Sequence, residues 1–214
     1  MQDRHYSAAD QVMIGVDQAL RTLFGRPQVT ERPNPSLTLD EPELTEQERD
    51  ETARLMRINH TGEVCAQALY QGQALTAKLP EVRSNMERAA QEENDHLDWC
   101  EKRLRELDNR KSLLNPFWYA GSFAIGAAAG LAGDRWSLGF VAETEHQVEA
   151  HLNNHLKRLP ENDEKSRVIL EQMKEDEIHH ATVALEAGGA ELPAPVKLVM
   201  KLSSKIMTKS VYYL

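Results

Sequence analysis

Two Glu-x-x-His motifs supply the residue types best suited to chemistry in this 214-residue sequence. The first runs from Glu93 to His96 and the second from Glu177 to His180. Residues three apart on a helix lie about 60° apart around its axis, so each motif presents a carboxylate and an imidazole in the same direction. One such motif is weak evidence for a metal site, because a charged helix produces the same spacing by chance.

A further glutamate precedes each motif at a similar interval. Glu63 lies 30 residues before Glu93, and Glu145 lies 32 residues before Glu177. The two halves together supply four carboxylates and two imidazoles, the ligand set of a di-iron carboxylate site in a four-helix bundle. Carboxylates with one imidazole per metal favour iron or manganese over structural zinc. The predicted metal ligands are Glu63, Glu93, His96, Glu145, Glu177 and His180.

Two motif positions leave alternatives open. Glu92 also precedes His96, but only Glu93 repeats the three-residue interval of the other half. His179 could take the place of His180, because it too follows acidic residues. These acidic residues are Glu175 and Asp176. We rank Glu92 below Glu93 because of this interval, and we rank His179 well below His180.

The third ligand-bearing segment contains three glutamates. Glu143 and Glu145 lie about 160° apart around a helix, so both cannot face one site, whereas Glu149 lies on the Glu145 side. Glu145 matches the spacing of the other half better. His151 follows on the same segment and could orient a ligand through a hydrogen bond, and a packing role for it stays open. Tyr70 is expected to pack in the core, although a redox or substrate contact is the alternative.

The segments that carry these residues are expected to be long helices, because none alternates apolar and polar residues as a strand would. Thr45 followed by Glu48 is a capping-box pattern that predicts the start of the first long helix, and Pro80 ends this helix. Gly188 predicts the end of the fourth long helix. The expected helices are 45–79, 81–109, 134–159 and 161–187, preceded by a helix at 8–24 and a Pro-rich connector at 25–44. The sequence therefore predicts an all-α four-helix bundle at 45–214 and an N-terminal region at 1–44.

Composition excludes several classes of protein. The 25 Lys and Arg residues against 34 Asp and Glu give a net charge of -9, which argues against a nucleic-acid binder. Two cysteines, Cys65 and Cys100, are too few for a disulfide scaffold or a cysteine-rich zinc module. The chain opens without a signal-peptide pattern, so we expect a cytoplasmic, reducing compartment.

Residues 112–133 contain no charged residue. Their alanines and glycines give little transfer energy, and a crossing there would place the two halves of the metal site on opposite sides of a membrane. We therefore expect an interfacial helix that lies against one leaflet. Ser122, Gly126 and Gly130 in this segment suit close helix approach. The alternative is a buried helix of a soluble protein.

The C-terminal residues 192–214 carry four lysines and no acidic residue. Lys197, Lys201, Lys205 and Lys209 recur every four residues along one face of an expected helix at 195–212. A basic amphipathic helix suits an anionic lipid surface, although an ordinary surface helix with extended lysines has the same pattern. We expect the protein to lie peripherally, in a monotopic manner, on the cytoplasmic face of the cell inner membrane.

Taken together, these motifs resemble the demethoxyubiquinone hydroxylases of ubiquinone biosynthesis. The matching stretches are NHTGEV at 59–64, EENDHL at 92–97, Glu145 with His151 and Asn153–Asn154, and DEIHH at 176–180. The resemblance covers roughly residues 50–214. It implies a ferritin-like fold with a di-iron centre, in which the six predicted residues bind iron and His151 lies near the centre.

The resemblance also implies a reaction. One oxygen atom from dioxygen would enter the ring of 2-polyprenyl-3-methyl-6-methoxy-1,4-benzoquinol, the penultimate step before ubiquinone. The implied cofactors are two iron ions, with dioxygen as co-substrate and an external electron donor that the sequence does not identify. The implied partners are the lipophilic quinol and a membrane surface, while a homo-oligomer or partner proteins of the pathway stay open.

Other functions share the ligand set. A ferritin-like protein for iron oxidation and storage is one alternative, and a di-iron quinol oxidase is another. The uncharged segment and the basic C-terminus count against the ferritin-like function. A membrane-bound helical adaptor without metal is the non-enzymatic alternative.

Overall fold

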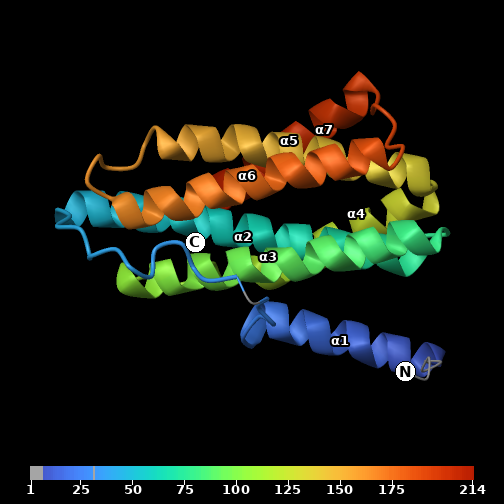
Figure 1. Ribbon diagram of the computed structural model, residues 1–214, viewed down its shortest axis with the longest axis horizontal. Coiled ribbons are helices and arrows are strands. Elements are labelled where there is room, and N and C mark those ends of the chain that lie inside the picture. Colours follow the sequence, from blue (N-terminus) through green and yellow to red (C-terminus); the bar gives the residue numbers. More distant parts are fainter. Residues whose placement is uncertain (1–6, 31) are drawn as a thin grey trace.

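The computed structural model describes residues 7–30 and 32–214, and helices make up most of these residues. The helices are α1 (Ala8–Phe24), α2 (Glu46–Thr76), α3 (Pro80–Glu106), α4 (Asn115–Leu131), α5 (Asp134–Leu156), α6 (Glu164–Glu186) and α7 (Ala194–Tyr213). No strand occurs within the two described ranges, which confirms the all-α prediction. The long helices α2, α3, α5 and α6 form a bundle in which the α2–α3 pair lies beside the α5–α6 pair (Figure 1).

Local sequence signals start and end these helices. The Thr45 hydroxyl accepts a hydrogen bond from the Glu48 backbone N–H, and the Glu48 carboxylate accepts one from the Thr45 N–H, as the capping-box pattern predicts. Ser7 and Asp10 form the same arrangement before α1. Gly188 has a φ of 96° just after α6, a conformation that glycine adopts without strain.

Four helix ends differ from the sequence-based expectation by three residues, namely the C-terminal ends of α2, α3 and α5 and the start of α6, and side-chain contacts explain two of them. α2 ends at Thr76 because Asp134, rather than a further helical turn, accepts hydrogen bonds from the backbone N–H groups of Lys78 and Leu79. α6 begins at Glu164 because the side chain of Asp163 caps it and accepts a hydrogen bond from the third following backbone N–H. None of these differences moves a ligand-bearing residue out of its helix.

The core of the described residues has three apolar clusters, one of them between α2, α3 and α4, and a polar band separates the other two. Of these two, one includes Leu55, Trp99 and Leu170, and the other includes Val82 and Leu138. On each of the four helices, the predicted metal ligands fall in sequence between the residues of these two clusters. The acidic and histidine side chains are therefore enclosed by apolar packing on both sides along the bundle axis.

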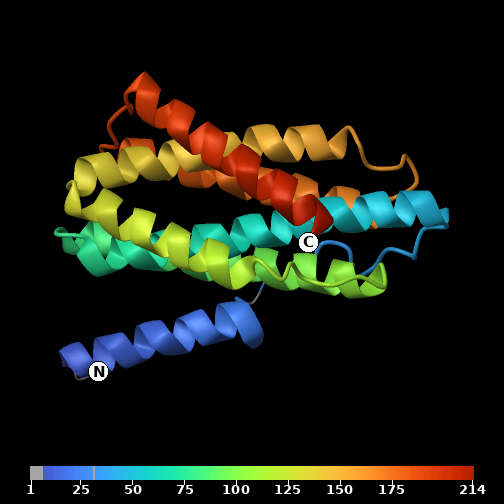
Figure 2. The same cartoon turned by 180° about the vertical axis from the view of Figure 1, so that it is seen from behind.

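α4 and α7 lie together on one side of the bundle (Figure 2). α4 packs so closely on α2 that a Cβ atom at Gly126 would collide with the backbone oxygen of Leu69. This contact confirms the close approach expected from the small residues. The opposite side of α4 exposes large apolar residues, Phe117, Ile125 and Leu131. Across the described part of the chain, no helix combines the length and apolar character needed to cross a bilayer.

Candidate metal centre

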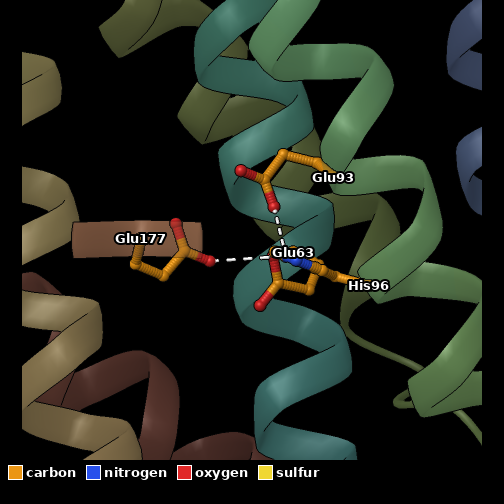
Figure 3. Close-up of side chains that lie close together, drawn as sticks. All are labelled: Glu63, Glu93, His96 and Glu177. Atoms are coloured by element: carbon orange, nitrogen blue, oxygen red, sulfur yellow. Dashed lines mark hydrogen bonds and ion pairs between the residues drawn. The ribbon is translucent and has the colours of Figure 1, made fainter. Parts of the chain in front are cut away.

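Three helices bring four side chains together at the middle of the bundle (Figure 3). Glu63 comes from α2, Glu93 and His96 come from α3, and Glu177 comes from α6. Nδ1 of His96 lies 3.0 Å from Oε2 of Glu93, 3.4 Å from Oε1 of Glu177 and 3.6 Å from Oε2 of Glu63. All four side chains are almost completely buried. We call these residues the first cluster.

A second cluster shares two of these glutamates. It consists of Glu93, Glu145, Glu177 and His180, and α5 contributes Glu145. Nδ1 of His180 lies 3.2 Å from Oε1 of Glu93 and 3.4 Å from Oε2 of Glu177. In each cluster, one potential ligand atom per residue lies within 4.8 Å of the others. Because Glu93 and Glu177 belong to both clusters, their two carboxylate oxygens can face two neighbouring metal positions.

The second cluster contains buried polar atoms that lack hydrogen-bond partners among the described residues. These atoms are Oε1 of Glu93, Oε2 of Glu145, Oε2 of Glu177 and Nδ1 of His180. A buried polar atom without a partner is costly, so native proteins almost always satisfy such atoms. All four belong to metal-ligating groups and meet at one place. The second cluster therefore fits a bound cation, and the four carboxylates of the two clusters together match the charge of two divalent ions.

Burial and neighbouring charges move the pKa values of the cluster in opposite directions. Burial, reinforced by the Glu93 carboxylate, raises the pKa of Glu63 well above its usual range. Burial also raises the pKa of Glu145. Burial opposes the ionised form of Glu93 as well, yet the attraction of His96 and the second histidine holds the Glu93 pKa well below normal. The metal-free cluster thus retains protons that a bound cation would displace.

Each histidine also contacts a carboxylate of the facing helix through Nε2, the ring nitrogen that points away from the clusters. Nε2 of His96 lies 2.8 Å from Oδ2 of Asp176, and Nε2 of His180 lies 2.7 Å from Oε2 of Glu92. Asp176 and Glu92 each directly precede the Glu of a Glu-x-x-His motif, so the arrangement has approximate twofold symmetry. An imidazole that binds metal through one nitrogen is oriented by such a contact at its other nitrogen.

The remaining glutamate and histidine alternatives lie outside the two clusters. His179 is exposed. The Glu143 carboxylate accepts a hydrogen bond from Gln147, and the Glu149 carboxylate accepts one from Asn153. The structure thus brings the six predicted residues together and leaves these three candidates outside. Glu92, the fourth alternative, lies outside both clusters and contacts His180.

His151 lies on α5, and its contact is with another histidine. The ring centroids of His151 and His155 are 3.9 Å apart, and Nε2 of His151 is buried without a hydrogen-bond partner in the described part of the structure. Burial lowers the pKa of His151 to about 4. The orienting role that we expected for His151 remains a prediction.

Sequence reasoning missed two side chains that support the centre. The Tyr70 hydroxyl donates a hydrogen bond to Oε1 of Glu145, a contact beyond the core packing that we expected for this residue. Arg32, in the connector between α1 and α2, donates from Nη1 to Oδ2 of Asp176 at 2.8 Å. No sequence signal points to Arg32. The acidic residue before each motif is a repeated feature that could have identified Glu92 and Asp176.

A four-helix bundle whose centre contains paired Glu-x-x-His motifs and two further glutamates defines the class of di-metal carboxylate proteins. The sequence model of the family described as "Ubiquinone biosynthesis protein COQ7" matches residues 50–211. The chain belongs to this family, which confirms the resemblance found in the sequence.

Relatives from several bacteria extend the similarity over nearly the whole chain. It is 59% identical over 214 residues to the 3-demethoxyubiquinol 3-hydroxylase of Nitrosococcus oceani, with 100% of both chains covered. It is 61% identical over 209 residues to the protein of the same name from Stutzerimonas stutzeri, with 98% of this chain and 97% of the relative covered. The corresponding protein of Nitrosospira multiformis is 60% identical over 204 residues, with 95% and 98% covered. The chain is thus an enzyme of an oxidoreductase family in ubiquinone biosynthesis.

Proposed function

We propose that this chain is a di-iron 3-demethoxyubiquinol 3-hydroxylase that acts on 2-polyprenyl-3-methyl-6-methoxy-1,4-benzoquinol. In the reaction, one atom of dioxygen replaces a ring hydrogen as a hydroxyl group. The other oxygen atom leaves as water, with two electrons from an external donor and two protons. The observation that carries the proposal is the buried pair of clusters, in which four ligand atoms lack hydrogen-bond partners among the described residues. It occurs in a chain that is 59% identical to a hydroxylase of that name over the full length of both chains.

The six predicted residues would hold the metal in distinct ways. Glu93 and Glu177 would contribute to both positions, whereas Glu63 with His96 and Glu145 with His180 would each contribute to one, as their membership of the two clusters suggests. When bound, a di-iron centre supplies the redox chemistry with which dioxygen is activated. The chain itself contributes a buried, apolar enclosure that keeps bulk water away from the reacting groups. Asp176 and Glu92 would keep the histidine rings in their ligating orientation.

The lipophilic substrate would reach the enzyme at a membrane surface on the side of α4 and α7. Leu198, Leu202 and Ile206 of α7 are exposed, as are the large apolar residues of α4. The four lysines of α7 add positive charge beside this apolar surface. Such a combination favours peripheral binding to a leaflet that contains anionic lipids, on the cytoplasmic face of the inner membrane.

The decisive experiment follows the oxygen atoms. The full chain is loaded with ferrous iron without oxygen, and then mixed with the quinol, a chemical reductant and isotopically labelled dioxygen. Mass spectrometry should find one labelled oxygen in the product ring. Oxidised quinone without added oxygen would support a quinol oxidase instead, and a ferric mineral with unchanged quinol would support iron storage. A chain that binds no iron would refute all three.

A further inference from the structure

The first cluster is supported by a hydrogen-bonded clamp that begins in the connector at Arg32, whose side chain is 36% exposed. Arg32 donates from Nη1 to Asp176 at 2.8 Å and from Nε to Oδ2 of Asp95 at 2.9 Å. Asp95 is completely buried and also accepts hydrogen bonds from the Thr30 backbone N–H at 2.7 Å and the Thr30 hydroxyl at 2.5 Å. Because Asp176 contacts Nε2 of His96, this network fixes the ring of a predicted ligand.

Packing reinforces the clamp from the apolar side. The Arg32 guanidinium lies over the ring of Trp99, 5.3 Å from its centroid. The Trp99 ring lies 5.4 Å from the His96 ring. The second carboxylate oxygen of Asp176 accepts a hydrogen bond from Gln172 at 3.1 Å. Both carboxylates behind His96, Asp176 and Asp95, therefore accept hydrogen bonds on each of their oxygens, whereas Nη2 of Arg32 is buried without a partner among the described residues.

The support behind His180 is more exposed, because it ends at Arg88 and contains no buried carboxylate comparable to Asp95. Nε2 of His180 contacts Glu92, whose side chain is 24% exposed. The other Glu92 oxygen accepts a hydrogen bond at 3.3 Å from Arg88, whose side chain is 80% exposed. A single ion pair with a largely exposed cation is weaker and more mobile than a network in which the arginine also pairs with a buried carboxylate. The second cluster is therefore less rigidly held.

A single phenol provides the remaining support of the second cluster. The Tyr70 hydroxyl occupies Oε1 of Glu145, so only the unpartnered Oε2 remains free for a ligand. Tyr70 lies seven residues after Glu63 on α2, and the residue seven after Glu145 on α5 is the buried Leu152. The two halves have similar ligand motifs, but only one of them has a tyrosine at this position. The hydroxyl group therefore breaks the symmetry between the two halves.

We infer that the two metal positions are inequivalent, with Arg32 a positioning residue for the first and Tyr70 a positioning residue for the second. The pre-arranged first cluster binds metal more tightly, and the second binds and exchanges its metal more readily. The connector at 25–44 is then a functional part of the centre although it lies outside the residues matched to the family. This inference rests on the proposed metal centre.

Metal titration of the full-length, metal-free chain tests the inference. Cobalt(II) serves as the probe, with visible absorption reporting coordination and a competing chelator reporting affinity. The wild type should bind two equivalents in two resolved steps. His96→Ala and His180→Ala, each of which removes one cluster's imidazole, identify the absorption spectrum that belongs to each position.

The positioning residues are then separated by their opposite effects. Arg32→Met should weaken the equivalent assigned to the first cluster by about 10–100-fold and change the other less than about threefold. Tyr70→Phe should do the reverse and alter only the spectrum of the second position. Arg32→Lys, which keeps the charge but loses the forked geometry, should fall between Arg32→Met and the wild type.

Two matched controls distinguish positioning from general damage to the fold. Arg54→Met removes another arginine that pairs with an aspartate, Asp50, and lies over an aromatic ring. Tyr119→Phe removes another buried tyrosine hydroxyl, one that donates to Gln71. Both should titrate like the wild type.

Two equal equivalents in the wild type, or joint weakening of both steps in Arg32→Met and Tyr70→Phe, would overturn the inference and leave the proposed hydroxylase intact. Absence of any cobalt or iron binding would instead refute the metal centre itself.

Discussion

Oδ2 of Asp176 lies 2.8 Å from Nε2 of His96, so the acidic residue before one Glu-x-x-His motif holds the histidine of the other. The same relationship in reverse joins Glu92 to His180. The two helix pairs therefore depend on each other for the orientation of their metal ligands. Each half of the centre therefore needs the other half in place for its histidine to be oriented.

Removal of Glu145 should reduce the iron content of the purified protein from two ions per chain toward one. Glu145→Ala deletes a carboxylate of the second cluster, whereas Glu149→Ala deletes a carboxylate one turn away that contacts Asn153. Elemental analysis of both variants checks the assignment. Unchanged iron in Glu145→Ala, or equal loss in Glu149→Ala, would contradict it.

Gly126→Ala should destabilise the fold, because its Cβ would collide with the Leu69 backbone, which cannot move aside as a flexible side chain does. We expect a loss of about 1–3 kcal/mol in the free energy of unfolding, measured in urea. Gly121→Ala makes the same chemical change on the same helix where nothing lies within 4 Å. It should be neutral or stabilise by up to about 1 kcal/mol, and equal losses in both variants would refute the close α2–α4 packing.

Arg103 should be a stability determinant remote from the metal centre. It is 1% exposed and donates to Asp163, which is completely buried, at 3.0 Å. Arg103→Met would leave the Asp163 carboxylate buried without its cation, at a cost of about 3–5 kcal/mol in urea unfolding. Asp163→Asn in the same chain should recover much of this loss while keeping a side chain that can cap α6. Full additivity of the two changes would argue against the pairing.

His60 should make the metal-free protein less stable in acid. Burial lowers the pKa of His60 to about 3, against an ordinary value near 6.5. Between these values the unfolded chain binds a proton that the folded chain does not. The free energy of unfolding therefore falls as pH decreases through this range, by about 1.4 kcal/mol per pH unit.

Replacement of His60 removes this contribution. His60→Gln should make the difference in unfolding free energy between pH 7 and pH 5 smaller by about 2 kcal/mol than in the wild type. Urea unfolding at both pH values, with metal removed, gives the comparison. Parallel stability curves for the two proteins would show that His60 is not a buried neutral imidazole.

Charge reversal on α7 should release the protein from anionic vesicles. The double variant Lys201→Glu, Lys205→Glu cancels the positive charge of the C-terminal segment, and each basic residue near such a surface contributes about 1 kcal/mol. Flotation with vesicles that contain an anionic phospholipid measures binding. Lys157→Glu changes an exposed lysine after α5 and should float like the wild type. A wild-type chain that fails to float would remove the membrane proposal.

Much of the centre could be predicted from the sequence, because helical periodicity and metal-ligand spacing are local properties. The three-residue interval in Glu93–His96 and Glu177–His180 identified residues that the structure places in two buried clusters sharing both glutamates. Capping patterns likewise placed the start of α2 at the correct residue. The division of the chain between residues 44 and 45 stays a prediction, and the clamp joins the two parts physically at Asp95.

Tertiary structure decided what lies behind the ligands. Arg32 and Asp176 are 144 positions apart, and no local pattern relates them. Tyr70 on α2 donates a hydrogen bond to Glu145 on α5, although these helices are not consecutive in the chain. The sequence by itself determined which residues share a helix face, since the helix repeat dictates that. Which faces then meet, and which polar atoms remain unpartnered between them, depends on how the whole bundle packs.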